Sequence, residues 1–310
     1  MADRGSMTSV GATATERNAE PVKGGLRSFV ATFSDLVKVR LTMLVLLTTA
    51  VGFYLGARGR VDFVALFNAV FGTAMAAAGA AALNLWWERR LDGLMERTRD
   101  RPIPSGRMLA GHAFLIGTLL ALGGVVYLAL MCNFLSAALG AATIGIYIFA
   151  YTPLKRISSV NTLVGAVPGA LPPMIGWAAA TGNVEPAAWS LFAILFCWQM
   201  PHFFAIAWMY REDYARGGFS MLSRDDDTGI RSASQGVLFC MLLLMITGGP
   251  FYLGLTSALY LPIALVLGAG FIVMAMKFHR QKTVPAARAL FFASIIYLPL
   301  LLLALVVTKI

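Results

Sequence analysis

Long apolar runs alternate with short polar segments along most of this 310-residue chain. Each run approaches the roughly 20 residues that a helix needs to cross a bilayer. Two pairs of runs are divided only by residues 131–133 and 256–257, and we separate them because an undivided run would be too long for one span. The pattern predicts nine membrane-spanning helices, near residues 40–57, 63–86, 110–130, 134–152, 160–180, 187–209, 236–256, 259–277 and 288–308.

The composition indicates an all-α polytopic membrane protein, because 58% of the residues are hydrophobic and only 13% are charged. The three cysteines, Cys132, Cys197 and Cys240, lie far apart in apolar segments and give no support for a disulfide or a zinc site. The net charge of +10 does not point to nucleic acid, because an arginine excess in a membrane protein mostly reports its topology.

The positive charges predict how the nine helices are oriented. If the amino terminus is inside, all but three of the 25 lysines and arginines lie in inside segments, and the exceptions are Arg58, Arg60 and Lys309. This bias predicts a cytoplasmic amino terminus and a carboxyl terminus outside. Residues 1–27 are polar and predict a disordered cytoplasmic tail, followed by a single intramembrane domain at 28–310. Acidic residues in the tail argue against a mitochondrial transit peptide, which favours the bacterial inner (plasma) membrane over the mitochondrial one.

Oxygen-bearing side chains recur every four residues at the end of the second predicted helix. Asn84, Glu88 and Asp92, hereafter the oxygen ladder, share one helix face, whereas Glu96 and Asp100 drift off that face. Acids this close to the apolar phase are rare and usually functional. Together with six arginines between residues 84 and 107, they suit a Mg²⁺ ion that bridges carboxylates to a diphosphate. The alternative is a solvated charged loop between two membrane helices.

Two further charged stretches follow the fourth and sixth predicted helices on the same membrane face. One contains Lys155 and Arg156, and the other contains Glu212, Asp213 and three more aspartates up to residue 227. Two acid clusters could each hold Mg²⁺ through one or two carboxylates, while the cations neutralise the rest of a diphosphate. A metal-bound diphosphate is a good leaving group, and an isoprenoid cation left behind needs a dry cavity.

Five aromatic side chains near these helix ends are candidates to stabilise such a cation through their ring faces. They are Trp86, Trp87, Tyr147, Phe203 and Phe204. Each of them also fits ordinary packing or anchoring at the membrane interface. Three prolines, Pro168, Pro172 and Pro173, are expected to kink the fifth helix.

The motifs in these stretches resemble those of the UbiA-type intramembrane prenyltransferases. The oxygen ladder is similar to the first aspartate-rich motif of that family, with Glu88 in place of a more common aspartate, and residues 101–106 resemble the Arg-Pro-x-Pro-Ser-Gly that follows it. Segments 92–102, 198–203 and 210–222 together resemble the branch of the family that farnesylates haem. The resemblance implies a UbiA-type bundle of nine helices.

The resemblance also implies a reaction. Farnesyl diphosphate would ionise with the help of Mg²⁺, its farnesyl carbon would join a vinyl group of haem b, and water would supply a hydroxyl group to give haem O. Besides the lipid bilayer, the implied partners are haem A synthase and terminal oxidase assembly factors. Two other functions stay open: a prenyltransferase for an aromatic quinone precursor, and a transporter. The scarcity of ionisable residues at the helix centres argues against the transporter.

The charge pattern and the resemblance together assign roles to individual residues. The predicted catalytic residues are Asn84, Glu88, Asp92 and Asp213, and the predicted Mg²⁺ ligands are Glu88, Asp92, Glu212 and Asp213. The predicted diphosphate-binding residues are Arg97, Arg101, Lys155, Arg156, Arg211 and Arg216. The candidates for haem contact are His202 and Tyr210. His202 could instead bond to a backbone carbonyl that the preceding Pro201 frees from the helix.

Overall fold

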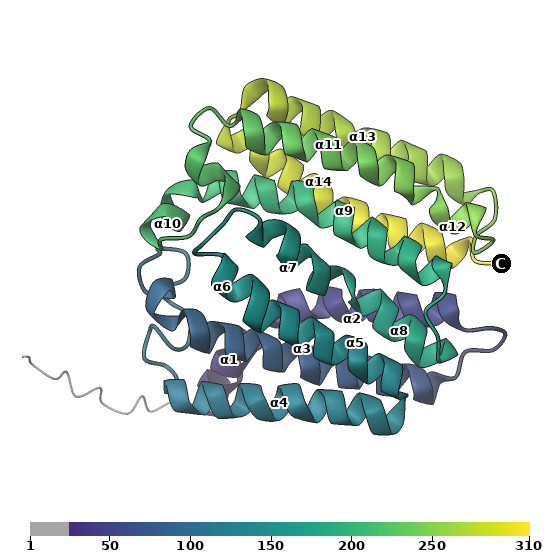
Figure 1. The fold of residues 1–310 in the computed structure, drawn as a ribbon, viewed down its shortest axis with the longest axis horizontal. Coiled ribbons are helices and arrows are strands. Elements are labelled where there is room, and N and C mark those ends of the chain that lie inside the picture. The colour runs from purple at the N-terminus through teal and green to yellow at the C-terminus, as the bar shows by residue number, and fades with distance from the viewer. Residues whose placement is uncertain (1–24) are drawn as a thin grey trace, which may run out of the picture.

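The computed structural model describes residues 25–310, and every regular element in that part of the chain is helical (Figure 1). The predicted tail at 1–27 therefore lies mostly outside the described residues. The helices are α1 Leu26–Leu36, α2 Val39–Gly56, α3 Phe63–Asp92, α4 Ala110–Met131, α5 Phe134–Gly145, α6 Thr152–Leu154, α7 Asn161–Ala170, α8 Pro172–Thr181, α9 Pro186–Met209, α10 Arg211–Arg216, α11 Ile230–Thr247, α12 Gly249–Tyr252, α13 Tyr260–Gln281 and α14 Val284–Val307.

The nine predicted spans are confirmed within the described residues, where nine helical stretches are long and apolar enough to cross a membrane. Most boundaries agree within a few residues. The largest differences are in α3, which runs six residues past the predicted end at 86, and in α11, which begins at Ile230 instead of 236. The short α1 was not predicted, because its 11 residues are too few for a span.

The spans form two groups that lie side by side in Figure 1. In one group α3 packs on α4 and α2 packs on α8, and in the other α9, α11, α13 and α14 pack on one another. Contacts of α7 and α8 with α9 join the two groups. The connections after α3 and α6, together with α10, gather at one end of the bundle, hereafter the loop end, and the carboxyl terminus lies at the opposite end.

Two spans are interrupted in ways that affect the loop end. The fifth is broken at Leu171, between α7 and α8, which confirms the kink predicted from its prolines. The fourth passes from α5 through a π-helical turn, Ile146–Tyr151, before it ends in α6. Such wide turns inside α-helices frequently occur at functional sites.

Glycines let two pairs of helices approach closely. A Cβ added at Gly52 of α2 would overlap the backbone of Pro173, and one added at Gly176 of α8 would overlap the backbone of Thr49. Gly79 of α3 meets α4 in the same way. Because lipid supplies no hydrophobic drive between helices, close contact through small residues is a main source of their association.

Gly176→Ala is expected to destabilise the protein, because its new methyl group would overlap the carbonyl oxygen of Thr49. Overpacking of this kind costs roughly 1–3 kcal/mol, so thermal unfolding in detergent should begin at a lower temperature. Gly270→Ala on α13 is the matched control, since a Cβ there meets no atom within 4 Å. An equal loss of thermal stability in both variants would show that close packing at Gly176 is unimportant.

Candidate active site

The oxygen ladder lies buried at the carboxyl end of α3. Asn84, Glu88 and Asp92 are 1%, 4% and 0% exposed. The helix ends at Asp92, so Glu96 and Asp100 lie in the following loop and are exposed, as the drift of their spacing predicts. The ladder is therefore an internal feature of the bundle, and the alternative of a solvated loop is wrong for these three residues.

Each member of the ladder is bonded to a cationic side chain from a different segment. Lys38 precedes α2, Arg101 lies in the loop after α3, and Lys155 follows α6. The bonds join Lys38 Nζ to Asn84 Oδ1 (2.9 Å), Lys155 Nζ to Glu88 Oε1 (2.8 Å), and one terminal nitrogen of Arg101 to both carboxylate oxygens of Asp92 (2.7 and 2.8 Å). Three positive groups thus converge on one face of α3.

The π-helical turn and the first residue of α6 supply the remaining contacts of the ladder. Thr152 Oγ1 accepts a hydrogen bond from Asn84 Nδ2 at 3.1 Å, and the Tyr147 hydroxyl donates to Asn84 Oδ1 at 3.4 Å. The Lys155 ammonium lies 4.5 Å from the centre of the Tyr151 ring, a cation–π contact. These contacts fix the side-chain amide of Asn84 and hold Lys155 against Glu88.

The two lysines differ in their charge. Burial lowers the pKa of Lys38 to about 7, and the nearby charges of Arg101 and Lys155 add to this effect. Burial also disfavours the charged form of Lys155, but the Glu88 carboxylate outweighs burial and raises the pKa of Lys155 above its ordinary value. At neutral pH Lys155 is therefore charged, whereas Lys38 titrates near neutrality.

Asp213, the predicted member of the second acid cluster, ties two loops together. It is 6% exposed, and its carboxylate accepts hydrogen bonds from the backbone N–H groups of Glu96 (3.0 Å) and Arg97 (3.2 Å). Arg216 forms a salt bridge to the same carboxylate at 2.6 Å. Burial alone would raise the pKa of Asp213, but these hydrogen bonds hold it below its usual value. The carboxylate is therefore ionised at any pH near neutrality, and the contacts position the loop that also carries Arg101.

The other charged residues predicted for the site do not bond to the oxygen ladder. The Glu212 side chain is 82% exposed, Arg156 is exposed, and the Arg211 guanidinium lies over the ring of Trp208. The Arg97 guanidinium lies over Tyr210 and donates to the Tyr214 hydroxyl. Of the six predicted diphosphate-binding residues, the structure places Arg101 and Lys155 at the ladder, Arg216 at Asp213, and the others elsewhere at the loop end.

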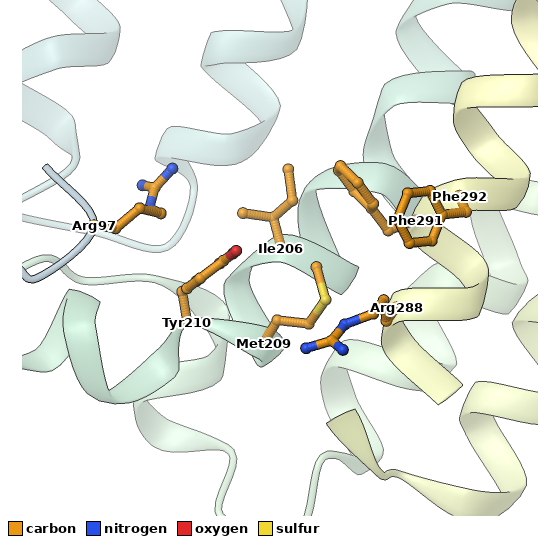
Figure 2. A pocket seen from close by; sticks show the side chains of 7 residues that line it. All are labelled: Arg97, Ile206, Met209, Tyr210, Arg288, Phe291 and Phe292. Atoms are coloured by element: carbon orange, nitrogen blue, oxygen red, sulfur yellow. The ribbon is translucent and has the colours of Figure 1, made fainter. Parts of the chain in front are cut away.

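His202 and Tyr210 lie near a small pocket between α9 and α14. The pocket has a volume of about 230 Å³ and is lined by Arg97, Ile206, Met209, Tyr210, Arg288, Phe291 and Phe292 (Figure 2). His202 Nδ1 shares a 2.7 Å hydrogen bond with the hydroxyl of Ser294, and its ring stacks on Phe291 at 4.8 Å. Its partner is thus a hydroxyl on α14 and not the backbone carbonyl considered from the sequence.

Among the aromatic candidates, Tyr147 touches the oxygen ladder. Trp86 packs against Phe114 of α4 at 4.7 Å, and Phe204 belongs to a hydrophobic cluster with Met200. For Trp86 and Phe204 the packing interpretation is therefore the one that the structure supports.

Sequence reasoning missed Lys38 and Thr152, although both bond directly to the ladder. Lys38 is indistinguishable in sequence from the many positive charges that flank inside helix ends. It also missed the role of Asp226, whose carboxylate accepts hydrogen bonds from the backbone N–H groups of Arg231 and Ser232 at the start of α11. A side chain that accepts bonds from the first turn of a helix is a cap, which stabilises that helix end.

The ladder offers a donor set that suits Mg²⁺. Glu88 and Asp92 present carboxylate oxygens one turn apart, next to the amide oxygen of Asn84. Within residues 25–310 no three His, Cys, Asp or Glu side chains lie close enough to hold a metal by themselves. Mg²⁺ usually takes one or two carboxylate ligands and completes its coordination shell with water and substrate phosphates. Glu212 and Asp213 do not form a comparable buried pair, because the Glu212 side chain is 82% exposed.

Comparison with known proteins decides the family. Residues 45–296 match the model of the UbiA prenyltransferase family. The chain belongs to this family. The UbiA prenyltransferase described here has the nine apolar helices that its sequence predicts, and its oxygen ladder lies within the matched region.

Relatives extend the match over nearly the whole chain. The UbiA prenyltransferase is 43% identical over 278 residues to a protein of Solibacter usitatus named protoheme IX farnesyltransferase (87% of this chain, 95% of the relative), and 46% identical over 283 residues to one of Opitutus terrae with the same name (90% and 96%). A mitochondrial protein of Homo sapiens with that name is 37% identical over 297 residues (96% and 66%).

A solved structure confirms the fold. A UbiA homolog from Archaeoglobus fulgidus, bound to DMAPP and Mg²⁺, superposes with a TM-score of 0.66 at 13% identity, over 89% of this chain and 99% of the homolog. At that identity the likeness concerns the helical bundle alone.

The affinity of this prenyltransferase for a prenyl diphosphate is expected to fall as the pH rises through about 7, where Lys38 loses its proton. Between pH 6 and 8 its protonated fraction falls from about nine-tenths to about one-tenth, so the affinity should fall up to about tenfold. The measurement is calorimetric titration with an unreactive farnesyl thiodiphosphate at both pH values.

Two variants separate the titration of Lys38 from that of the ligand. Lys38→Arg keeps its charge at both pH values and should remove most of the change, whereas Lys38→Met should bind weakly at both. If all three proteins show the same pH dependence, the titrating group is the ligand and not Lys38.

Asp213→Ala is expected to loosen the loop after α3, because the backbone N–H groups of Glu96 and Arg97 lose their acceptor. Hydrogen–deuterium exchange, followed by mass spectrometry, should be faster in peptides that cover residues 93–101. The neighbouring Glu212→Ala is the control, since the Glu212 side chain is 82% exposed and should leave the exchange unchanged. Equal exchange in the two variants would show that the hydrogen bonds of Asp213 do not order the loop after α3.

Proposed function

We propose that this UbiA prenyltransferase transfers the farnesyl group of farnesyl diphosphate to a vinyl group of haem b, with addition of water, to give haem O and diphosphate. The proposal is supported by the bacterial relatives named protoheme IX farnesyltransferase, which are 43% and 46% identical to the chain over nearly their whole length. It is also supported by the motifs at 92–102, 198–203 and 210–222, which resemble the haem branch of the family.

The observation that carries the proposal is the convergence of three cations on the buried oxygen ladder. Lys38, Arg101 and Lys155 each hold one ladder residue at 2.7 to 2.9 Å. These three cations outnumber the two carboxylates of the ladder, because Asn84 is neutral, and the excess positive charge points to an anionic ligand with several charged oxygens. A diphosphate fits this arrangement, since its oxygens can accept charge-assisted hydrogen bonds from all three.

Glu88 and Asp92 would hold Mg²⁺, which when bound neutralises part of the charge on the diphosphate. The Archaeoglobus fulgidus homolog is bound to both DMAPP and Mg²⁺. Asn84 remains fixed by Thr152 and Tyr147. Lys38, Arg101 and Lys155 would bind the diphosphate oxygens and stabilise the negative charge that grows as the bond to carbon breaks.

The allylic C–O bond breaks, and its electron pair leaves with the diphosphate. The resulting farnesyl cation is attacked by the vinyl group of haem b, which forms the new C–C bond. Water adds to the cation produced on the former vinyl carbon and loses a proton, which leaves the hydroxyl group. The buried environment of the ladder excludes water from the first of these steps and so protects the farnesyl cation.

We place the enzyme in the inner membrane of a bacterium, with the loop end in the cytoplasm. The nine apolar helices support a multi-pass membrane protein, and the positive-inside bias and the bacterial relatives support the finer placement. Haem A synthase and terminal oxidase assembly factors are the expected protein partners, because they would use a farnesylated haem.

Asp92→Asn is expected to lower kcat/KM for farnesyl transfer at least 100-fold, since it removes a charge that positions Arg101 and would hold Mg²⁺. The assay supplies purified enzyme with haem b, farnesyl diphosphate and Mg²⁺ and detects the hydroxyethylfarnesyl haem by mass spectrometry. The reaction should also stop when a chelator removes Mg²⁺. Glu185→Gln, whose side chain pairs with Arg58 at the opposite end of the bundle, should keep its activity.

A parallel assay offers 4-hydroxybenzoate as acceptor. Farnesylation of this acid, with no change to haem b, would leave the family intact and refute the haem assignment. Product formation from haem b with undiminished activity in Asp92→Asn would refute the role of the ladder instead.

A further inference from the structure

The pocket between α9 and α14 combines apolar walls with two arginines that have no carboxylate partner among the described residues. Ile206 and Met209 on α9 face Phe291 and Phe292 on α14 across it. Figure 2 shows Arg97 and Arg288 on opposite sides of the pocket, with Tyr210 and Met209 between them. Both arginines are exposed, and among the described residues neither forms an ion pair with a carboxylate.

We infer that this pocket binds the edge of the haem acceptor that carries its two carboxylates, with Arg288 on α14 as the principal carboxylate-binding residue and Arg97 as the second. The inference rests on the proposed function and adds the location and orientation of the acceptor. It also gives Arg97 a different role from the diphosphate contact predicted from the sequence, in agreement with its position over Tyr210 and away from the oxygen ladder.

The size of the pocket determines how much of the acceptor it can take. A pocket that encloses a whole drug-sized ligand has roughly 300–1,000 Å³. At about 230 Å³ this one is smaller, so it suits one edge of a porphyrin and not the entire ring. A guanidinium group binds carboxylate oxygens through paired N–H donors, and one arginine on each side suits the two carboxylates of haem b.

His202 braces the apolar wall of the pocket. Its ring stacks on Phe291 at 4.8 Å and on Trp198 at 5.6 Å, and its Nδ1 is engaged with Ser294. Ile206, one turn further along α9, lines the pocket directly. His202 therefore supports Phe291, which lines the pocket, and does not itself belong to the lining.

One loop joins this pocket to the oxygen ladder. Arg101 binds Asp92, Arg97 lines the pocket, and the backbone N–H of Arg97 is bonded to Asp213. The binding site for the acceptor and the binding site for the diphosphate are thus positioned by the same short segment. In this orientation the vinyl edge of a haem, opposite its carboxylates, would point away from the two arginines.

The test compares haem b with its dimethyl ester, in which both carboxylates are esterified. With the natural enzyme the ester should bind more weakly, and Arg288→Gln should raise KM for haem b roughly 10- to 100-fold while KM for farnesyl diphosphate changes less than about twofold. Arg288→Gln should discriminate little between haem b and the ester, because the guanidinium group that binds the carboxylates has been removed. Arg97→Gln should give a smaller change in the same direction.

The matched control is Arg280→Gln, an exposed arginine at the end of α13 that does not line the pocket. It tests whether removal of any exposed positive charge at this end of the bundle reduces the preference for haem b over the ester. The inference is overturned if Arg288→Gln leaves the preference for haem b over the ester unchanged, or if Arg280→Gln reduces it equally.

A binding titration makes failure of the inference distinguishable from failure of the proposed function. Haem b and its ester are titrated into the enzyme without farnesyl diphosphate, and binding is followed by the absorption of the haem. Binding that depends on Arg288 and on the free carboxylates, without farnesyl transfer to haem, would support the pocket and refute the function. Transfer to haem with no dependence on Arg288 would support the function and refute the pocket. Absence of both would refute both.

Discussion

The loop end of this protein depends on charges buried in an apolar bundle. Glu88 and Asp92 are almost fully buried, and a carboxylate in that position is tolerated only if it is paired. Their partners Lys155 and Arg101 come from separate parts of the chain, so the loop after α3 and the end of α6 must both meet α3 before the charges are balanced. Charge compensation therefore fixes the relative position of elements that are far apart in sequence.

Hydrogen bonds to backbone groups also link the loops that surround the ladder. Asp213 accepts from the loop after α3, while the backbone N–H of Ser220 donates to the carbonyl oxygen of Lys155 at 2.6 Å. Asn161 at the start of α7 donates to the carbonyl oxygen of Ser220 at 2.9 Å. Three connections that would otherwise be independent are thus linked into one rim around the ladder, and a movement of one must be shared by the others.

The sequence predicts the spans and the buried face of α3, but it does not predict which side chains bond to the ladder. The nine spans follow from the length of the apolar runs, and the buried face of α3 follows from the four-residue spacing of Asn84, Glu88 and Asp92. Both are local properties of the chain. The partners of the ladder are set by tertiary packing, which spacing does not record, so Lys38 and Thr152 were missed. The role inferred for Arg288 does not follow from the sequence either, because its pocket forms only where α14 meets α9.

The π-helical turn at Ile146–Tyr151 lets the fourth span vary in length without turning the residues that follow it. It accommodates an extra residue in a span that is otherwise α-helical, and Lys155 lies shortly after it. A π-helical turn completes the same rotation as an α-helical turn with about one residue more, so loss of that residue would leave Lys155 on the face that meets Glu88. The side chains within the turn would change place instead, and with them the contacts of Tyr147 and Tyr151. A change of length in this segment therefore alters the aromatic surroundings of the ladder and leaves its ion pair intact.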